Sequence, residues 1–307
     1  FKSFLAIGLI LSFFAYWGMW RIFKTFYAIH PNYIRYAAWS ALFIPSVIFW
    51  SGSISKDAIT LGCTGIVFHA IHQLFLSPAK SRSIFAILSV LFPTLYLLSS
   101  IKGYIVVAMI PALAIWILVA FRAKINNIGL RFIITPVILV IGILSIVGLV
   151  RLMGSTNTFD TFASDAVYQK IYIQNLYLSN ASRAGSAYNI GTIEPNLASI
   201  MSVFPKAVNV TLFRPYLWEI NNAAAMLAAL ESAIILFLAV SIFLNAGIFR
   251  PFKLIWSSPF LIFCLIFSVV FGAAMGMTSG NFGTLMRYKI PCMPFFFFML
   301  AILYDQT

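Results

Sequence analysis

A ten-residue stretch in the second half of the chain combines side chains suited to binding a sugar phosphate. Aromatic faces stack on sugar rings, and amides bind their hydroxyls, so Tyr216, Trp218 and Asn221 are candidate substrate-binding residues. Glu219 is a candidate base for an acceptor hydroxyl, with Arg214 beside it in the catalytic group. An equally weighted alternative is that Glu219 only pairs with Arg214 and holds the loop. The stretch reads Phe213-Arg214-Pro215-Tyr216-Leu217-Trp218-Glu219-Ile220-Asn221-Asn222.

Lys56 and Asp57 end a second patch, which follows Pro45 and holds several serines. We predict Lys56 as a substrate-binding cation and Asp57 as a catalytic carboxylate. Asp57 also stands near the expected start of a helix, where a carboxylate complements the helix dipole. That structural role is an equal alternative to a general base.

Two more patches carry isolated cations. Lys102 is the single charge in a predicted tight turn over 99–104. A glycine-rich stretch over 276–291 contains Asn281, Arg287 and Lys289. Glycines permit close backbone approach to a ligand. We predict Arg287 as a catalytic residue, and we predict Lys102, Asn281 and Lys289 as substrate-binding residues. The alternative for the last stretch is a flexible hairpin with interfacial anchors.

Long apolar runs must position these patches. The chain has 307 residues, of which 62% are hydrophobic and 9% charged, whereas soluble domains carry about 25% charged residues. Apolar runs near the roughly 20 residues that cross a bilayer recur throughout. The sequence therefore predicts an all-α polytopic transmembrane helix bundle. The nine expected spans are 4–20, 36–50, 58–76, 83–99, 103–121, 131–150, 222–246, 257–276 and 289–304.

The distribution of Lys and Arg orients these spans. Four turns, at 21–35, 77–82, 122–131 and 247–256, are rich in cations and contain no acidic residue. The positive-inside rule makes their side cytoplasmic. The chain then divides into spans 1–6 over 1–150, a helical extracytoplasmic loop over 151–221 and spans 7–9 over 222–307.

We single out five cations of the predicted extracytoplasmic side that lie within a few residues of a span, where they oppose the insertion bias. Desolvating such a cation costs several kcal/mol unless it is paired, so a shared cavity would suit phosphate or pyrophosphate. For any single cation, lipid-headgroup contact or pairing with a carboxylate is favoured; for the set, we predict an anion site. The five are Lys56, Lys102, Arg214, Arg287 and Lys289.

Other chemistry has less support. Glu231 is an intramembrane carboxylate and hence a functional candidate, although hydrogen bonding inside the bundle is the alternative. His69 and His72 share a helix face without a further ligand, and the three cysteines form no CxxC pair, so we expect neither a metal nor another cofactor. The net charge of +13 is explained by membrane orientation, and nucleic acid is not an expected partner. Because the first residue is Phe1, we expect the natural N-terminus to lie upstream.

Three stretches resemble bacterial exopolysaccharide and O-antigen polymerase-like membrane proteins. They are Pro-x-x-x-Phe-Trp-Ser…Lys-Asp at 45–57, Arg-Pro-Tyr-x-Trp-Glu at 214–219 and Arg-Tyr-Lys-x-Pro at 287–291. The resemblance implies a multi-pass protein of the bacterial cytoplasmic (inner) membrane. It also implies extracytoplasmic glycosyl transfer from a polyprenyl-pyrophosphate-linked glycan during cell-envelope polysaccharide assembly. Arginines would stabilise the leaving pyrophosphate without a metal.

Three alternatives remain open. A transferase using a polyprenyl-monophosphate sugar usually carries an adjacent acidic pair, which this chain lacks. A transporter or flippase is supported by the intramembrane Glu231 and the glycine-rich region, because transporters often have broken helices lined by polar groups. Many transporters also contain an internal repeat, and we find none in this sequence. A non-catalytic subunit of a larger membrane complex would use the 17% aromatic residues for contacts with membrane lipids and partner proteins.

Overall fold

The computed structural model describes residues 3–77, 83–125, 136, 188–191, 197–220 and 223–307, and these residues are helical, without a strand. The helical fold predicted from the sequence is thus confirmed. The elements are α1 (Phe4–Ile29), η1 (Pro31–Tyr33), α2 (Ile34–Leu42), α3 (Pro45–Ser51), α4 (Lys56–Phe75), α5 (Ile84–Ala123), α8 (Leu197–Phe213), η3 (Leu217–Glu219), α9 (Ala223–Ala246), α10 (Phe249–Ser257), α11 (Pro259–Ser279), α12 (Phe282–Tyr288) and α13 (Met293–Gln306).

Several of these helices are long and apolar enough to cross a membrane. Among the described residues there are five, α1, α4, α5, α9 and α11, or six if α12 and α13, bent by 79°, form one span. The protein is therefore a multi-pass membrane protein, but the nine expected spans are not confirmed. The expected span 131–150 lies almost wholly outside the described residues.

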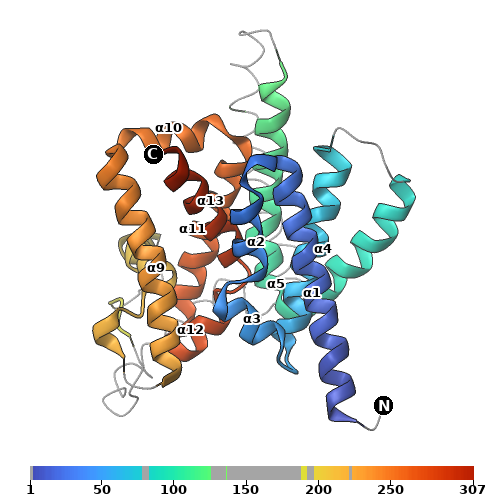
Figure 1. Ribbon diagram of the computed structural model, residues 1–307, viewed down its shortest axis with the longest axis horizontal. Helices are drawn as coiled ribbons and strands as arrows, with labels where there is room; N and C mark the ends of the chain where they lie inside the picture. The colour runs from blue at the N-terminus through green and yellow to red at the C-terminus, as the bar shows by residue number, and fades with distance from the viewer. Residues whose placement is uncertain (1–2, 78–82, 126–135, 137–187, 192–196, 221–222) are drawn as a thin grey trace.

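Two expected spans are joined in one helix. α5 covers both 83–99 and 103–121 and is interrupted at Lys102, whose φ of −144° and ψ of 69° are not helical. Figure 1 shows the two halves meeting at a sharp bend and diverging from it. The turn predicted at 99–104 is thus a bend within a continuous helical segment.

The expected span 36–50 is broken instead. α2 ends at Leu42 and α3 starts at Pro45, because proline has no N–H to continue the helix but is well suited to a first helical turn. Seven-residue α3 is too short to cross a bilayer, which needs about 20 helical residues. Together α2, α3 and the α12–α13 pair give the bundle two discontinuous helices.

The ends of the bundle are defined by these connections (Figure 1). The α3–α4 turn, the α5 bend and α12 lie at one end, here called the Asp57 end. The α1–α2 turn, the C-terminal end of α5 and α10 lie at the other, here called the α10 end. The cation-rich turns predicted to be cytoplasmic belong to the α10 end in the described part of the chain. Its assignment to the cytoplasm remains a prediction.

α8 lies within 151–221, the segment expected to form a helical extracytoplasmic loop, and its side of the membrane stays a prediction. It packs against α11, and a Cβ added to Gly276 would overlap the carbonyl oxygen of Ala207. Thr211 also donates to the carbonyl of Gly272 at 2.7 Å. Gly276 therefore allows the backbones of α8 and α11 to approach closely. This part of the segment is a packed member of the bundle.

The core is aromatic. Phe68, Phe260, Phe263 and Phe295 are almost fully buried and contact one another with ring centroids 4.8–6.4 Å apart. Offset and edge-to-face contacts of this kind add about 0.5–1.5 kcal/mol per pair beyond burial. They fix α4, α11 and α13 as a frame for the polar groups at the Asp57 end.

A glycine contact joins α1 to α4. A Cβ on Gly18 would overlap the carbonyl of Gly62, and a Cβ on Gly65 would overlap that of Gly18. We expect Gly18→Ala to destabilise the protein by about 1–3 kcal/mol, because the backbones must separate. Thermal unfolding of the detergent-purified protein measures this.

Gly8→Ala is the matched control in the same helix, since its Cβ would meet only the flexible Ile54 side chain at 3.4 Å. Equal melting temperatures for the two variants would contradict the proposed α1–α4 contact.

Candidate functional site

Asp57 lies in the first turn of α4. The helix is preceded by Ser55, whose Oγ accepts the Asp57 N–H at 3.2 Å. Ser53 Oγ lies 2.6 Å from Ser55 Oγ, so the serines of this patch form a chain of hydrogen bonds at the turn. The helix N-terminus favours a negative charge at Asp57. Local sequence therefore fixes the position of this carboxylate.

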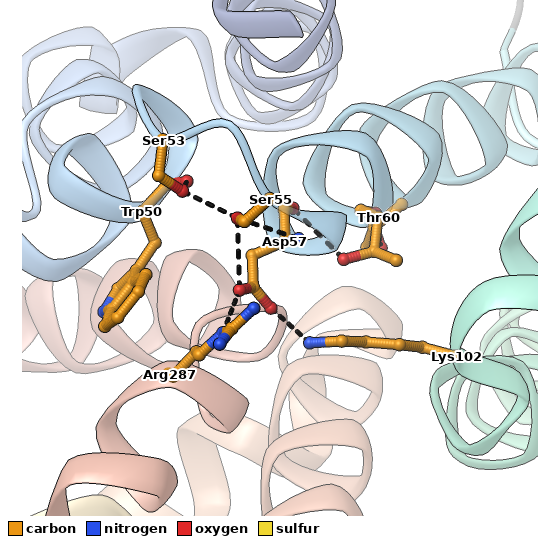
Figure 2. Close-up of polar contacts among 8 residues, drawn as sticks. Trp50, Ser53, Ser55, Asp57, Thr60, Lys102 and Arg287 are labelled. Carbon is orange, nitrogen blue, oxygen red and sulfur yellow. Dashed lines mark hydrogen bonds and ion pairs between the residues drawn. The ribbon is translucent and has the colours of Figure 1, made fainter. Parts of the chain in front are cut away.

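Two cations from distant parts of the chain bind Asp57. Lys102 Nζ donates to its Oδ1 and Arg287 Nε donates to its Oδ2. Figure 2 shows the carboxylate between them, with Lys102 coming from α5 and Arg287 from α12. The Asp57 side chain is 2% exposed. We call Asp57, Lys102 and Arg287 the Asp57 clamp.

Lys102 reaches Asp57 because α5 bends there. The non-helical backbone of Lys102 is followed by Gly103, and the ammonium lies 4.9 Å from the Tyr288 ring centroid and 5.9 Å from that of Tyr104. Aromatic faces attract a cation, most strongly away from water. These rings and Asp57 offset the desolvation of a lysine side chain that is 9% exposed.

Arg287 differs from Lys102 in being accessible. Its side chain is 38% exposed, and its guanidinium carbon lies 5.2 Å from the Trp50 ring centroid. Only Nε bonds to Asp57; within the described part of the chain, the two terminal nitrogens have no hydrogen-bond partner. They form the planar fork that binds carboxylate or phosphate in a bidentate manner.

The charges around the clamp do not balance. Lys56, adjacent to Asp57, is exposed, so three cations accompany one carboxylate at this place. Excess positive charge in a partly desolvated site attracts an anion. Of the five cations predicted to share an anion site, the structure groups Lys56, Lys102 and Arg287 here.

Arg214 instead forms its own ion pair. Its Nε donates to Glu219 Oε2 at 3.0 Å, and its Nη2 donates to Oε1. The Tyr216 N–H also donates to Oε2 at 2.8 Å. Burial acts to raise the pKa of Glu219, but the hydrogen bonds from Arg214 and Tyr216 outweigh it and hold this pKa below its usual value. The pair is locally neutral.

The aromatic residues of this stretch stack on each other. The Tyr216 and Trp218 rings have centroids 4.8 Å apart and planes 26° apart. The Tyr216 hydroxyl bonds to the Asn209 side chain of α8 at 3.0 Å, while Trp218 is 79% exposed. The stack therefore presents an accessible aromatic face. Asn221, predicted to bind substrate, lies outside the described residues.

Lys289 is separate from the clamp and fully buried. Its Nζ donates to Ser232 Oγ at 3.3 Å, and Ser232 Oγ donates to the Arg214 carbonyl at 3.1 Å. Its direct contact is thus a protein hydroxyl, which gives it a packing role between α12, α9 and the Arg214 stretch. The sequence offered no signal for Ser232.

Glu231, next to Ser232 in α9, has a defined role in the structure. It accepts hydrogen bonds from the Ser46 N–H at 2.8 Å and the Ser46 hydroxyl at 2.9 Å. Both groups lie in the first turn of α3, whose backbone N–H groups lack partners within the helix. Glu231 thus caps a short helix from a distance of 185 residues in sequence.

α12 connects the two ion-pair groups. The Arg214 guanidinium carbon lies 5.1 Å from the Phe282 ring centroid, and Arg287 follows Phe282 by five residues, a rise of about 7.5 Å along a helix. Asn281 caps α12, its Oδ1 accepting the Gly283 N–H at 2.7 Å. α12 therefore contacts both ion-pair groups, through Phe282 near its start and Arg287 in its last turn.

Tyr188 holds the turn before α12. Its hydroxyl donates to the Gly276 carbonyl at 2.8 Å and accepts the Gly280 N–H at 3.1 Å. Burial raises the pKa of this phenol, which keeps the hydroxyl proton that the first of these bonds requires. Gly280 has a φ of 66°, a conformation that glycine adopts without strain.

No metal site emerges from the described residues, which contain no group of three or more His, Cys, Asp or Glu side chains able to hold an ion. His69 Nδ1 lies 2.8 Å from Thr25 Oγ1, and His72 is buried against Trp116 with ring centroids 6.0 Å apart. The two histidines therefore have separate surroundings.

The arrangement favours anion binding over proton abstraction at Asp57. Each oxygen of Asp57 accepts a hydrogen bond from a cation, as does each oxygen of Glu219. Either carboxylate must leave its cation to act as a base. Freeing Glu219 from its cation costs less than freeing Asp57, because the Glu219 side chain is 19% exposed and the Asp57 side chain is 2% exposed, and the more deeply buried carboxylate is the costlier one to leave unpaired.

Comparisons with protein-family models, curated proteins and solved structures gave no match to this chain. The site is accordingly interpreted from its own geometry.

The clamp should stabilise the fold as well as position Arg287. We expect Asp57→Asn to destabilise the protein by about 3–5 kcal/mol, because it leaves a buried ammonium without its counter-charge. Asp305→Asn, which alters an exposed carboxylate bonded to the Tyr36 hydroxyl, is the control. Unfolding of both purified variants in detergent measures the effect; equal stabilities would contradict it.

The Arg214–Glu219 pair should make stability depend on pH. Because the pKa of folded Glu219 is lowered, the pair stabilises the fold above the usual glutamate pKa, and this contribution is lost as pH falls through the lowered value. We expect Glu219→Gln to be less stable than wild type at neutral pH and to lose less stability on acidification. Parallel melting curves at every pH would contradict this expectation.

Proposed function

We propose that the protein transfers glycosyl groups on the extracytoplasmic side of a bacterial cytoplasmic membrane, using a polyprenyl-pyrophosphate-linked glycan as donor. The observation that carries the proposal is the accessible guanidinium of Arg287. Asp57 and Trp50 hold it in place, while its terminal nitrogens keep their hydrogen-bonding capacity. Exposed Lys56 lies in the same turn as Asp57.

The chemistry requires a stabilised leaving group. The acceptor hydroxyl attacks the anomeric carbon of the donor, the new C–O bond forms, and the bond from that carbon to the pyrophosphate oxygen breaks. Negative charge develops on the departing pyrophosphate, and preorganised cations lower the barrier most effectively there. Arg287 and Lys56 supply those cations in this proposal, and Lys102 keeps Asp57 and Arg287 oriented.

The acceptor hydroxyl must lose a proton as it attacks. Glu219 is the base in this proposal, since its side chain is 19% exposed, whereas that of Asp57 is 2% exposed. The exposed face of Trp218 and the adjoining Tyr216 ring provide a stacking surface for the glycan. α12 holds the two halves of the site together through Phe282 and Arg287.

A second candidate is transport of a lipid-linked anion. It is favoured by the discontinuous α2–α3 and α12–α13 segments, because transporters often form substrate sites from broken helices. The α2–α3 break also has a structural explanation, because Glu231 caps the N-terminus of α3 and stabilises the break. The broken helix is therefore weaker support for transport.

Arg287→Ala should weaken binding of polyprenyl pyrophosphate by about 10- to 100-fold, the value of losing a charge-assisted bidentate contact. Arg287→Lys should retain part of the affinity, since an ammonium supplies charge without the fork. Binding is measured with labelled polyprenyl pyrophosphate and protein in nanodiscs. Polyprenol, which lacks the pyrophosphate, is the ligand control.

Arg35→Ala is the control variant, because it removes an exposed cation from the α10 end. Unchanged affinity in Arg287→Ala would overturn the assigned anion site. Release of polyprenyl pyrophosphate from a glycan-linked donor, lost in Glu219→Gln, supports transfer. Movement of an unaltered donor across sealed vesicles supports transport instead.

A further inference from the structure

α10 joins two helices, α9 and α11, that are each long and apolar enough to cross a membrane. It has nine residues, a rise of about 13.5 Å, which is less than half of the roughly 30 Å of hydrocarbon in a bilayer. Figure 1 shows α10 running across the end of the bundle between α9 and α11. A short helix that joins two neighbouring spans in this way lies at the level of a membrane surface.

The turns on both sides of α10 set its direction. Gly247, at the end of α9, has a φ of 68°, a left-handed conformation that glycine adopts without strain. At the other end, Ser258 is the N-cap residue of α11 and Pro259 is its first residue, a combination that favours a new helix start. The chain therefore changes direction before and after α10.

One face of α10 holds it on the bundle. Pro251 and Ile255 are four residues apart, so they lie on the same side of the helix, and both are buried where α10 packs against α9 and α11. Nη2 of Arg250 also donates to the carbonyl oxygen of Gln306 at 2.8 Å. These contacts fix the rotation of α10 about its own axis.

A second face of α10 is apolar and exposed. Phe249, Phe252 and Trp256 are spaced i, i+3 and i+7, which places them on one side of a helix. Their exposed fractions are 88%, 44% and 69%. Three large aromatic side chains in contact with water would be unfavourable, whereas aromatic side chains are favourable at the boundary between headgroups and acyl chains. This face therefore suits the membrane boundary.

A third face of α10 is cationic. Arg250 and Lys253 are three residues apart and exposed, and exposed Ser257 lies on the same side. α10 contains no acidic residue. Within the described part of the chain, neither cation forms an ion pair with a carboxylate. This face is therefore complementary to the negative charge of anionic lipid headgroups.

We propose that α10 is an interfacial helix that binds anionic phospholipids. A helix with aromatic side chains on one face and Lys or Arg on another lies in the plane of the membrane, with its apolar face at the boundary of the acyl chains. Phe249, Phe252 and Trp256 enter that boundary, while Arg250 and Lys253 bind the headgroup phosphates. The proposal is independent of glycosyl transfer, since it uses no residue of the Asp57 end.

Lipid recognition is tested with photoactivatable phosphatidylglycerol and phosphatidylcholine that carry the same chains, using the purified protein in nanodiscs. Mass spectrometry measures the yield of crosslinks within residues 248–258. We expect phosphatidylglycerol to give the higher yield. Lys253→Gln should lower this yield about fivefold, the effect of one cation near an anionic membrane surface.

Lys206→Gln is the matched control, because it removes an exposed cation from α8 and should leave the yield unchanged. Equal yields from the two lipids, or a phosphatidylglycerol yield that is the same in Lys253→Gln and wild type, would overturn the proposed recognition of anionic lipid.

The orientation of α10 is tested with spin labels on Phe249→Cys and Ser257→Cys, two exposed positions on its apolar and polar faces. The three native cysteines are buried, so the introduced thiol is the accessible one. In nanodiscs, the label at 249 should be relaxed mainly by oxygen, which partitions into lipid, and the label at 257 mainly by a water-soluble nickel chelate. Equal exposure of both labels to the nickel chelate, or shielding of the label at 249 from both reagents by a protein surface, would overturn the proposal.

Discussion

The Asp57 end of the protein is organised by one buried carboxylate that binds two cations. Asp57 begins α4, Lys102 lies at the bend of α5, and Arg287 lies in the last turn of α12. The three segments are far apart in sequence, and the buried ammonium of Lys102 would lack a counter-charge without the carboxylate. The contact therefore fixes both the local fold and the direction of the arginine.

The consequence is an uneven distribution of positive charge. Arg214 is neutralised by Glu219, and Lys289 is buried against Ser232. Among the described residues, the clamp combines two cations with one carboxylate, and Lys56 adds another charge beside it. An anionic ligand approaching this end therefore meets its strongest attraction at Arg287, the more exposed member of the clamp.

Much of the helical architecture could be predicted from the sequence, because long apolar runs have few alternatives to a membrane helix. The span count could not. The stretch over 36–50 reads as one apolar run, yet it is broken at Pro45, and the break is capped by Glu231 from another helix. No local pattern reports a cap that lies 185 residues away.

The candidate site was accessible from the sequence only in part. Lys102, Arg214 and Arg287 could be identified because cations are rare beside the extracytoplasmic ends of membrane helices. Asp57 and Glu219 could be identified because they are the carboxylates of two patches that also contain cations. The pairing of Arg214 with Glu219 is local, whereas the binding of Lys102 and Arg287 to Asp57 depends on packing between α4, α5 and α12. The contact between Trp50 and the Arg287 guanidinium also depends on this packing.

A cryo-electron microscopy map of the protein in nanodiscs with polyprenyl pyrophosphate is the most direct test of the anion site at Arg287. We expect pyrophosphate density against the terminal nitrogens of Arg287 and the ammonium of Lys56, with Asp57 still bound to Lys102. Pyrophosphate density located elsewhere, with the Arg287 guanidinium bound only to water, would contradict it.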